Sequence, residues 1–494
     1  MSEHKDSYRN VMKATSIFGG VQVFNILIAI VRSKCIALFI GPSGMGIASL
    51  LNSTLGLVNG VSNLGLDRSA VKDISFAREN DTDARVSRTI SILKRLVWFT
   101  ACFGAVLMIV ASPWLSEFAF DSKEFTLSFI WISIALLFKQ FTNSQLAILQ
   151  GLRKLKDLAM ANLFGNFLGL LITVPLYYFF RIDAIVPAII LTALISFIFT
   201  YFYSNRVEIT KSPISTSEAF SEGKDMMQLG VMLSISSMMS LLVAYIIQIY
   251  ISQQGGVDEV GLYNAGFVIL NTYVGIIFTA MATDYFPRLA GVAEDIIKIR
   301  KAVFEQAFTA VLLITPIIVA FLMFAQFIIV LLYSSDFTPI VKMVSWGILG
   351  MVFKAVSFSM GYIIIAKGDS KLFIKTAVAF NSLLLIGNVI GYYFGGLEGL
   401  GLSFFLYYII HFVSLRVITQ YRYGFYFGKG FYGVFICCVA LCVTAFLLTF
   451  ISNDLLKYGI LSGVTVLSFV FSYFQLDKKM DVKDLINKIF RRKK

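Results

Sequence analysis

Four positively charged side chains lie inside long apolar runs, where a charge is costly: Arg32, Lys34, Lys139 and Lys354. Lys139 and Lys354 lie near the middle of their runs, and a cation at the centre of a bilayer costs ~2.5–3.5 kcal/mol on insertion scales. Such a cation belongs either to a cavity that holds an anionic substrate or to a buried structural ion pair. Because few acidic residues occur at that depth, we expect a cationic interior that binds an anion.

Arg32 and Lys34 cannot both face one cavity in a regular helix, because two residues correspond to a rotation of roughly 200°. Arg32 shares a helical face with Asn25, so we expect Arg32 and Asn25 to line the cavity. Lys34 lies near the end of its run, where its long side chain can either enter the cavity or reach the outer headgroups.

Asparagines form stripes on two other apolar runs. The first stripe contains Asn52, Asn59 and Asn63, and the second contains Asn264 and Asn271. A polar face on a membrane helix must point at protein or water, because lipid offers no hydrogen-bond partner. Two interpretations remain open for these residues: lining of a substrate cavity, or packing between helices.

Charged pairs follow both asparagine stripes, Asp67 with Arg68 and Asp284 with Arg288. They are expected at the cytoplasmic rim, where they either close an inner gate by pairing between the two halves or remain solvated. His411 lies in the middle of another apolar run, as a packing histidine or as a proton relay.

The elements that must position these side chains are membrane-spanning helices. Of the 494 residues, 57% are hydrophobic and only 14% are charged, whereas about 25% are charged in a soluble domain. Apolar runs of about 20 residues are long enough to cross a bilayer. The sequence predicts an all-α polytopic membrane protein with no soluble domain on either face. About fourteen spans are expected: residues 14–41, 45–65, 94–115, 126–150, 157–180, 183–204, 225–252, 259–284, 303–333, 340–366, 372–394, 398–420, 431–452 and 456–476.

The basic residues alternate between the two sides of these spans. With the N-terminus inside, 34 of the 42 Lys and Arg residues are cytoplasmic, and four lie on the opposite side. This asymmetry is typical of the positive-inside rule, so both termini are expected in the cytoplasm. The net charge of +13 therefore indicates topology and attraction to anionic lipid, not nucleic-acid binding. Residues 477–494 form a basic cytoplasmic tail, either an amphipathic helix or a solvated chain.

An internal repeat with an offset of 215 residues relates two parts of the chain. Gly46 matches Gly261, Phe138-Lys139 matches Phe353-Lys354, and Tyr177-Tyr178-Phe179 matches Tyr392-Tyr393-Phe394. Between the last two landmarks Gln150-Gly151 falls opposite Lys367-Gly368, an offset of 217, so a small compensating insertion or deletion is expected there.

The repeat predicts two pseudo-symmetric six-helix lobes, residues 1–215 and 216–425, followed by a helical hairpin at 426–476. Because six is even, both lobes enter the membrane from the same side, as in transporters built from parallel repeats. Such transporters bind their substrate between the repeats. No phosphate-binding loop and no histidine-rich metal site occurs in the sequence, so we expect no cofactor.

Several stretches resemble a known family. LFIGPSGMGIASL, NLGLDRSAVKDIS, GGVDEVGLYNA and the long run SSDFTPIVKMVSWGILGMVFKAVSFSMGYIIIAKGDSKLF are similar to bacterial lipid-linked oligosaccharide flippases of the Wzx type. These proteins belong to the MOP superfamily, together with MATE exporters and lipid II flippases. The resemblance covers residues 10–425 and implies a central cavity lined by the first, second, seventh and eighth spans.

The resemblance also implies a cargo and a role. The cargo is an undecaprenyl-diphosphate-linked oligosaccharide, the repeat unit of O-antigen, capsule or common antigen, moved from the inner to the outer leaflet of the bacterial inner membrane. Lys34 and Lys354 match positions where some members carry lysine. The seventh span has no basic residue past Lys224, a departure from members with a cation there. Coupling to H⁺, Na⁺ or the membrane potential and contact with a polysaccharide polymerase and chain-length machinery are further expectations.

Two other functions fit an all-α membrane protein. A MATE-like cation-coupled multidrug exporter needs carboxylates in its cavity, whereas the mid-span charges here are positive. An integral membrane glycosyltransferase or polymerase usually has a large extracytoplasmic loop or an acidic catalytic motif, and the sequence contains neither. Alternating-access transport of an anionic lipid-linked cargo is therefore the favoured function.

Overall fold

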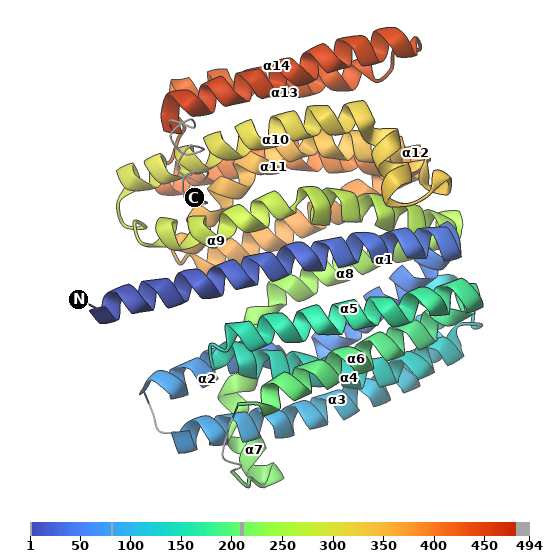
Figure 1. Ribbon diagram of the computed structural model, residues 1–494, viewed down its shortest axis with the longest axis vertical. Coiled ribbons are helices and arrows are strands. Elements are labelled where there is room, and N and C mark those ends of the chain that lie inside the picture. Colours follow the sequence, from blue (N-terminus) through green and yellow to red (C-terminus); the bar gives the residue numbers. More distant parts are fainter. Residues whose placement is uncertain (1, 81–82, 208–211, 481–494) are drawn as a thin grey trace. The chain divides into compact units, whose positions relative to one another are not determined.

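The computed structural model describes residues 2–80, 83–207 and 212–480, so the end of the basic tail lies outside the described residues (Figure 1). The described chain is helical and contains no strand. The helices are α1 (Ser2–Ser62), α2 (Leu66–Asn80), α3 (Asp83–Phe120), α4 (Thr126–Gly151), α5 (Leu155–Phe180), η1 (Arg181–Ala184), α6 (Ile185–Asn205), α7 (Thr216–Glu222), α8 (Lys224–Val268), η2 (Ile269–Val274), α9 (Ile276–Ala290), α10 (Ile296–Leu332), η3 (Ser335–Phe337), α11 (Ile340–Ala366), α12 (Ser370–Tyr423), α13 (Lys429–Leu448) and α14 (Asp454–Met480).

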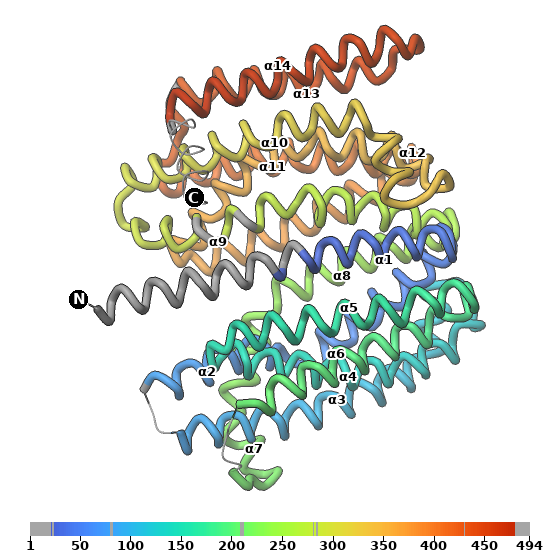
Figure 2. Tube along the Cα trace, viewed as in Figure 1, coloured from blue at the N-terminus to red at the C-terminus, as the bar shows by residue number. Residues whose placement is uncertain are grey.

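Nine helical segments of the described chain are long and apolar enough to cross a membrane. The expected all-α polytopic membrane protein is confirmed at this level. Four of the nine segments are between 39 and 56 residues long, about twice or more the ~20 residues that one crossing needs. Each of the four contains a break in helical geometry, at Gly41, Arg181, Gly256 or Gly395–Gly396. These breaks coincide with the junctions expected between successive spans (Figure 2).

The helices divide into two compact units. Unit 1 comprises Met1–Leu262 and Leu332–Asp336, and unit 2 comprises Tyr263–Leu331 and Phe337–Lys494. The division falls inside α8. The lobes expected from the repeat meet at residue 215 instead, and those lobe boundaries, with the separate hairpin at 426–476, stay a prediction.

The 215-residue repeat is visible in backbone conformation. Gly41 kinks α1 with φ 63° and ψ −168°, and Gly256 kinks α8 with φ 82° and ψ 176°. The two positions are 215 residues apart. Because an L side chain rarely adopts this conformation, glycine at both positions allows the same sharp kink. Arg181 and Gly396 show the same relation, with φ 52° and 53°.

The prediction that the offset changes within the repeat is wrong. Arg153 and Gly368, again 215 residues apart, both adopt left-handed backbone with φ 53° and 67°. Their N–H groups donate to carbonyls three residues earlier, at 2.9 and 3.0 Å, and the next N–H groups donate to carbonyls five residues earlier. Matching the glycines of Gln150-Gly151 and Lys367-Gly368 suggested an offset of 217. The structure keeps the turn at offset 215 and places arginine where the second copy has glycine.

Repeat-related residues contact each other where α1 crosses α8 within unit 1. A Cβ on Gly46 would lie 1.8 Å from the Val257 carbonyl oxygen, and a Cβ on Gly261 would lie 2.0 Å from the Pro42 carbonyl oxygen. Ser43 donates a hydrogen bond to the carboxylate of Asp258. Since each contact maps onto its partner by the 215 offset, the two helices cross about a local twofold axis. Both glycines are needed for backbones this close.

Each unit has one central helix, and the two central helices are repeat-related. In unit 2, 67% of the apolar window of α11 is buried, the largest share among the candidate spans. In unit 1, α4 packs against α2, α3 and α6. Phe138 on α4 stacks on Phe197, and Phe353 on α11 packs against Phe412 at the same offset. These two helices carry Lys139 and Lys354.

The short helix α7 docks on α3 of unit 1. Ser215 and Glu218 form a capping box at the start of α7, and Phe220 packs on Phe99 with ring centroids 5.3 Å apart. Arg88 on α3 donates from Nε to one carboxylate oxygen of Glu222 at 2.8 Å and from Nη2 to the other. Paired donors of this kind match carboxylate geometry and fix the orientation of α7.

Acid is expected to loosen α7 from α3. The hydrogen bond from the Ser215 backbone lowers the pKa of Glu218, and the hydrogen bond from Arg88 lowers the pKa of Glu222. A lowered carboxyl pKa stabilises the docked state above the ordinary value of 4.5, and this stabilisation is lost as the pH falls through the lowered value. Distances between spin labels on α3 and α7 should be narrow at neutral pH and broad below about pH 4. An Arg88→Gln variant should lose most of this pH dependence; an unchanged profile would contradict the assignment.

Candidate functional site

Lys354 on α11 is surrounded by neutral groups in unit 2. Its Nζ donates to Asn271 Oδ1 at 3.2 Å and lies 5.4 Å from the ring centroid of Phe278 and 5.3 Å from that of Tyr408. Phe278 and Tyr408 are buried. Aromatic faces attract a cation through their quadrupole, more strongly where water is excluded. Part of the cost of this half-buried ammonium is offset in this way, and its charge is not neutralised.

Asn271 reaches Lys354 from a π-helix. The segment η2 (Ile269–Val274) interrupts the α-helical path between α8 and α9, and such single-turn π segments occur frequently at functional sites. Gly275 follows directly, and a Cβ there would lie 1.9 Å from the Asn271 carbonyl oxygen, so the tight path requires glycine. The widened turn places the Asn271 amide toward α11.

No carboxylate pairs with Lys354 among the residues that the structure describes. His411 on α12 shares the neighbour Tyr408 with Lys354, with its ring centroid 6.1 Å from that of Tyr408 and 4.3 Å from that of Phe380. Its Nδ1 is buried and has no hydrogen-bond partner in the described chain. Unit 2 therefore holds an uncompensated ammonium beside an unsatisfied imidazole nitrogen.

A second polar cluster joins α1 to α5 in unit 1. Arg32 donates from Nη2 to the Asn166 carbonyl oxygen at 3.0 Å, and Asn166 donates from Nδ2 to Asn25 Oδ1 at 3.2 Å. Arg32 Nε is buried and has no partner among the described atoms. The structure thus connects both Asn25 and Arg32, which were predicted to line the cavity, to Asn166 on α5. Their cavity-lining role stays a prediction. A guanidinium with an unused donor can still bind an anionic group.

The other two predicted cations, Lys139 and Lys34, match Arg32 and Lys354 in being partly buried. Lys139 on α4 is half-buried, and its ammonium has no hydrogen bond or ion pair with a described residue. The repeat explains the contrast with Lys354, since the position corresponding to Asn271 is Gly56, which has no side chain. Lys34 is half-buried on α1. The cavity-lining roles of Lys34 and Lys139 stay predictions.

The asparagine stripes are not uniform. Asn52 is exposed and donates to the Ala48 carbonyl of its own helix at 2.8 Å, and Asn63 is buried and donates to Asp67 Oδ1 at 2.8 Å. Asn59 is half-buried with an unpartnered Oδ1 within the described chain, and Asn264 is half-buried. Within the described residues, Asn271 of the second stripe and Asn25 on α1 make side-chain hydrogen bonds to helices far apart in the sequence. The cavity-lining role of the stripes stays a prediction.

The predicted gate residues have partners inside their own units. Asp67 accepts from Asn63, and Arg68 donates to the Leu233 carbonyl at 2.8 Å in unit 1. Arg288 pairs with Glu305 at 3.3 Å in unit 2, while the side chain of Asp284 lies outside the described residues. Pairing between the halves stays a prediction.

Sequence reasoning missed three of the partners. Asn166 lies in the middle of a predicted span, and its polarity was a usable signal. Phe278 and Tyr408 are two of many aromatic residues in the chain, so nothing in the sequence separates them from ordinary core positions. No group of three or more His, Cys, Asp or Glu side chains that could hold a metal occurs in the described chain.

The family model described as polysaccharide biosynthesis protein matches residues 35–342, more than half of the chain. The chain belongs to this family. Among relatives of this polysaccharide biosynthesis protein is a putative O-antigen transporter of Shigella flexneri, 23% identical over 358 residues that cover 70% of this chain and 82% of that protein. The lipid III flippase of Escherichia coli (strain K12) is 22% identical, over 72% of this chain and 84% of that protein.

Solved structures share the fold of this polysaccharide biosynthesis protein. The lipid II flippase MurJ in an inward closed conformation has a TM-score of 0.68 and 14% identity, covering 95% of this chain and 99% of that chain. An inward-facing multidrug resistance MATE family transporter of the MOP superfamily also has a TM-score of 0.68, with 15% identity over 81% of this chain and 94% of that chain. The likeness to both shows that the helical fold is shared with these transporters.

Proposed function

We propose that the protein is a flippase that moves undecaprenyl-diphosphate-linked oligosaccharide repeat units from the inner to the outer leaflet of the bacterial cytoplasmic membrane. The family and the names of its relatives support a transporter role in surface polysaccharide biosynthesis rather than an enzyme. Alternating access fits a protein with repeat-related segments in both units. The cargo carries a diphosphate, so the protein must attract an anion inside the membrane.

The observation that carries this proposal is the neutral surroundings of Lys354. An ammonium paired with a carboxylate presents little net charge, whereas one held by an amide oxygen and two aromatic rings keeps its full attraction for an anion. Arg32 retains a free buried donor in the other unit. A drug exporter for cations needs the opposite charge at these positions.

The proposed topology has fourteen spans in two six-helix lobes plus the α13–α14 hairpin, with both termini in the cytoplasm. The four long segments, if each crosses twice, together with the five remaining candidate spans and α4, give that number. The asymmetric distribution of Lys and Arg supports the orientation. Coupling to H⁺, Na⁺ or the membrane potential, a gate formed by the Asp67 and Asp284 pairs, and contact with a polymerase and chain-length machinery belong to the same proposal.

Purified protein in vesicles tests the proposal. A fluorescent undecaprenyl-diphosphate oligosaccharide on the outer face should become protected from a membrane-impermeant quencher at a rate that rises with the amount of protein. Vesicles with heat-inactivated protein are the control. Export of a cationic dye without movement of the lipid-linked cargo would contradict the flippase assignment and favour a multidrug exporter.

A further inference from the structure

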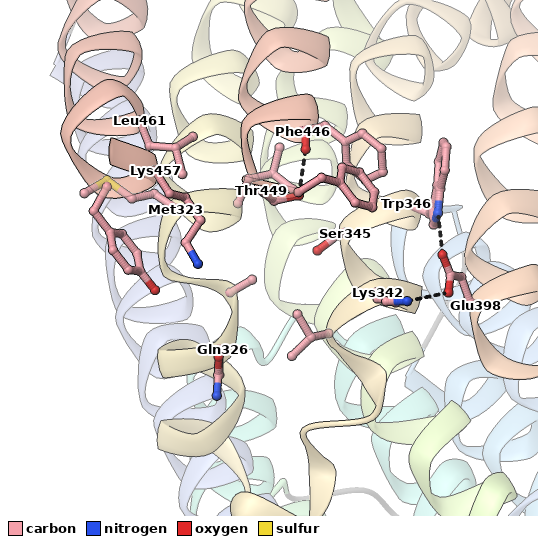
Figure 3. A pocket seen from close by; sticks show the side chains of 15 residues that line it. Met323, Gln326, Lys342, Ser345, Trp346, Glu398, Phe446, Thr449, Lys457 and Leu461 are labelled. Carbon is pink, nitrogen blue, oxygen red and sulfur yellow. Dashed lines mark hydrogen bonds and ion pairs between the residues drawn. The ribbon is translucent and has the colours of Figure 1, made fainter. Parts of the chain in front are cut away.

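A cavity of about 250 Å³ lies in unit 2 between α10, α11 and α12 and the hairpin α13–α14 (Figure 3). Its polar lining consists mainly of Gln326, Lys342, Ser345, Glu398, Thr449 and Lys457, and its apolar walls include Leu322, Met323, Phe446 and Leu461. This volume corresponds to about eight waters of ~30 Å³ each, enough for a compact headgroup and too little for lipid chains.

The cavity lies at the ends of membrane helices. Its residues flank the end of α10, the start of α11, the break at Gly395–Gly396 in α12 and the turn between α13 and α14. Trp346 and Tyr458 line it, and these residue types concentrate at membrane–water interfaces. The adjoining loops are among those with few Lys and Arg residues, so in the proposed orientation the cavity faces the outer leaflet.

The polar groups leave one positive charge without a partner in the lining. Glu398 accepts from Lys342 at 3.2 Å and from Trp346 Nε1 at 3.4 Å, so its charge is used within the wall. Lys457 Nζ lies 2.6 Å from Asp454, whose side chain is 77% exposed and lies outside the lining. The Lys457 side chain is 20% exposed, and an ammonium has three donors, so donors remain for a ligand beside the bond to Asp454.

Ser345 supplies an unused donor. It is 6% exposed, and its hydroxyl has no hydrogen-bond partner among the described residues. Figure 3 shows the Ser345 hydroxyl on α11 and the Lys457 ammonium on α14 pointing toward the space between these helices. A buried polar group without a protein partner is normally satisfied by water or by a ligand.

We propose that this cavity binds the phosphodiester headgroup of an anionic outer-leaflet phospholipid. The phosphate accepts from Lys457 and Ser345, and the acyl chains continue along the apolar walls into the bilayer. The lipid joins the α13–α14 hairpin to α10 and α11. The site is separate from the Lys354 centre and is independent of the identity of the transported cargo.

Native mass spectrometry of the full-length protein tests this site. Protein released from mixed micelles should retain one phosphatidylglycerol. Lys457→Gln should lower the retained fraction about fivefold, the effect of removing one lysine near an anionic lipid surface. Ser345→Leu should lower it as well, by filling the cavity while both lysines remain. Lys371→Gln, on α12 and outside this cavity, is the matched control and should retain lipid like the wild type.

Three outcomes would overturn the proposal. Equal retention by wild type and both variants would show adventitious binding only. Retention of phosphatidylethanolamine to the same extent would show that the negative headgroup is not recognised. Preferential retention of undecaprenyl phosphate would assign the cavity to the cargo lipid. Lys457→Gln removes a charge, and Ser345→Leu removes space in the cavity. Because the two variants act in different ways, either one alone tests the proposal if the other does not accumulate as a monodisperse protein.

Discussion

Lys354→Gln lowers translocation of the lipid-linked cargo about tenfold or more, while the protein still accumulates in the membrane. Glutamine is neutral, is close in length to lysine, and its amide can still donate to Asn271 Oδ1. The substitution therefore removes the charge and keeps the hydrogen bond. The interaction that is weakened is the one between the ammonium and the diphosphate of the cargo. A hydrogen bond to a charged group contributes ~1.5–3 kcal/mol, and each 1.4 kcal/mol is a factor of about ten in rate or affinity. The initial rate of cargo translocation in vesicles, divided by the amount of reconstituted protein, measures the effect.

Two variants separate charge from structure. Lys354→Arg keeps the charge and should retain more activity than Lys354→Gln. Lys375→Gln makes the same chemical change at an exposed position on α12 and should be neutral. Full activity of Lys354→Gln would exclude a role for this charge in transport. Loss of folded protein in Lys354→Gln, with normal activity per molecule, would assign Lys354 to stability alone.

The sequence was sufficient to predict the features that the surrounding lipid dictates. Lipid forces apolar residues into runs of about 20 and disfavours charges within them. The all-helical architecture, the breaks near Gly41 and Gly256, and the presence of cations at mid-span follow from that constraint. Arg32 and Asn25 lie on one helical face, which is fixed by a period of 3.6 residues, and both reach Asn166.

The features that depend on a partner could not be predicted. Asn271 reaches Lys354 through a π-helix, and no periodicity in the sequence indicates that extra residue in the turn. The predicted alignment of the two repeat copies was wrong near Arg153 for a related reason. Glycine favours left-handed backbone, yet Arg153 adopts the same conformation as Gly368, so matching residue types shifted the alignment by two positions. Backbone conformation is the property that the two copies share.

Gly46→Ala should destabilise unit 1 strongly. The new Cβ would lie 1.8 Å from the Val257 carbonyl oxygen and 2.8 Å from its carbon, both backbone atoms that no rotamer change can move. Either α1 and α8 separate or the chain distorts near Gly41 and Gly256. Overpacking of a well-packed contact costs ~1–3 kcal/mol and occasionally more, and a clash with backbone belongs at the upper end. The apparent Tm of the detergent-purified protein should fall by about 5 °C or more.

Gly56→Ala is the matched control, because it lies on the same helix ten residues further along and a Cβ there meets nothing within 4 Å. Alanine in a helix interior is favoured over glycine by roughly 0.5–1 kcal/mol, so this variant should be as stable as the wild type or slightly more so. Gly261→Ala, which would place a Cβ 2.0 Å from the Pro42 carbonyl oxygen, should reproduce the Gly46→Ala loss because the twofold relation makes the two contacts equivalent. If the Gly46→Ala and Gly56→Ala proteins had the same apparent Tm, the backbones of α1 and α8 would not cross at this distance.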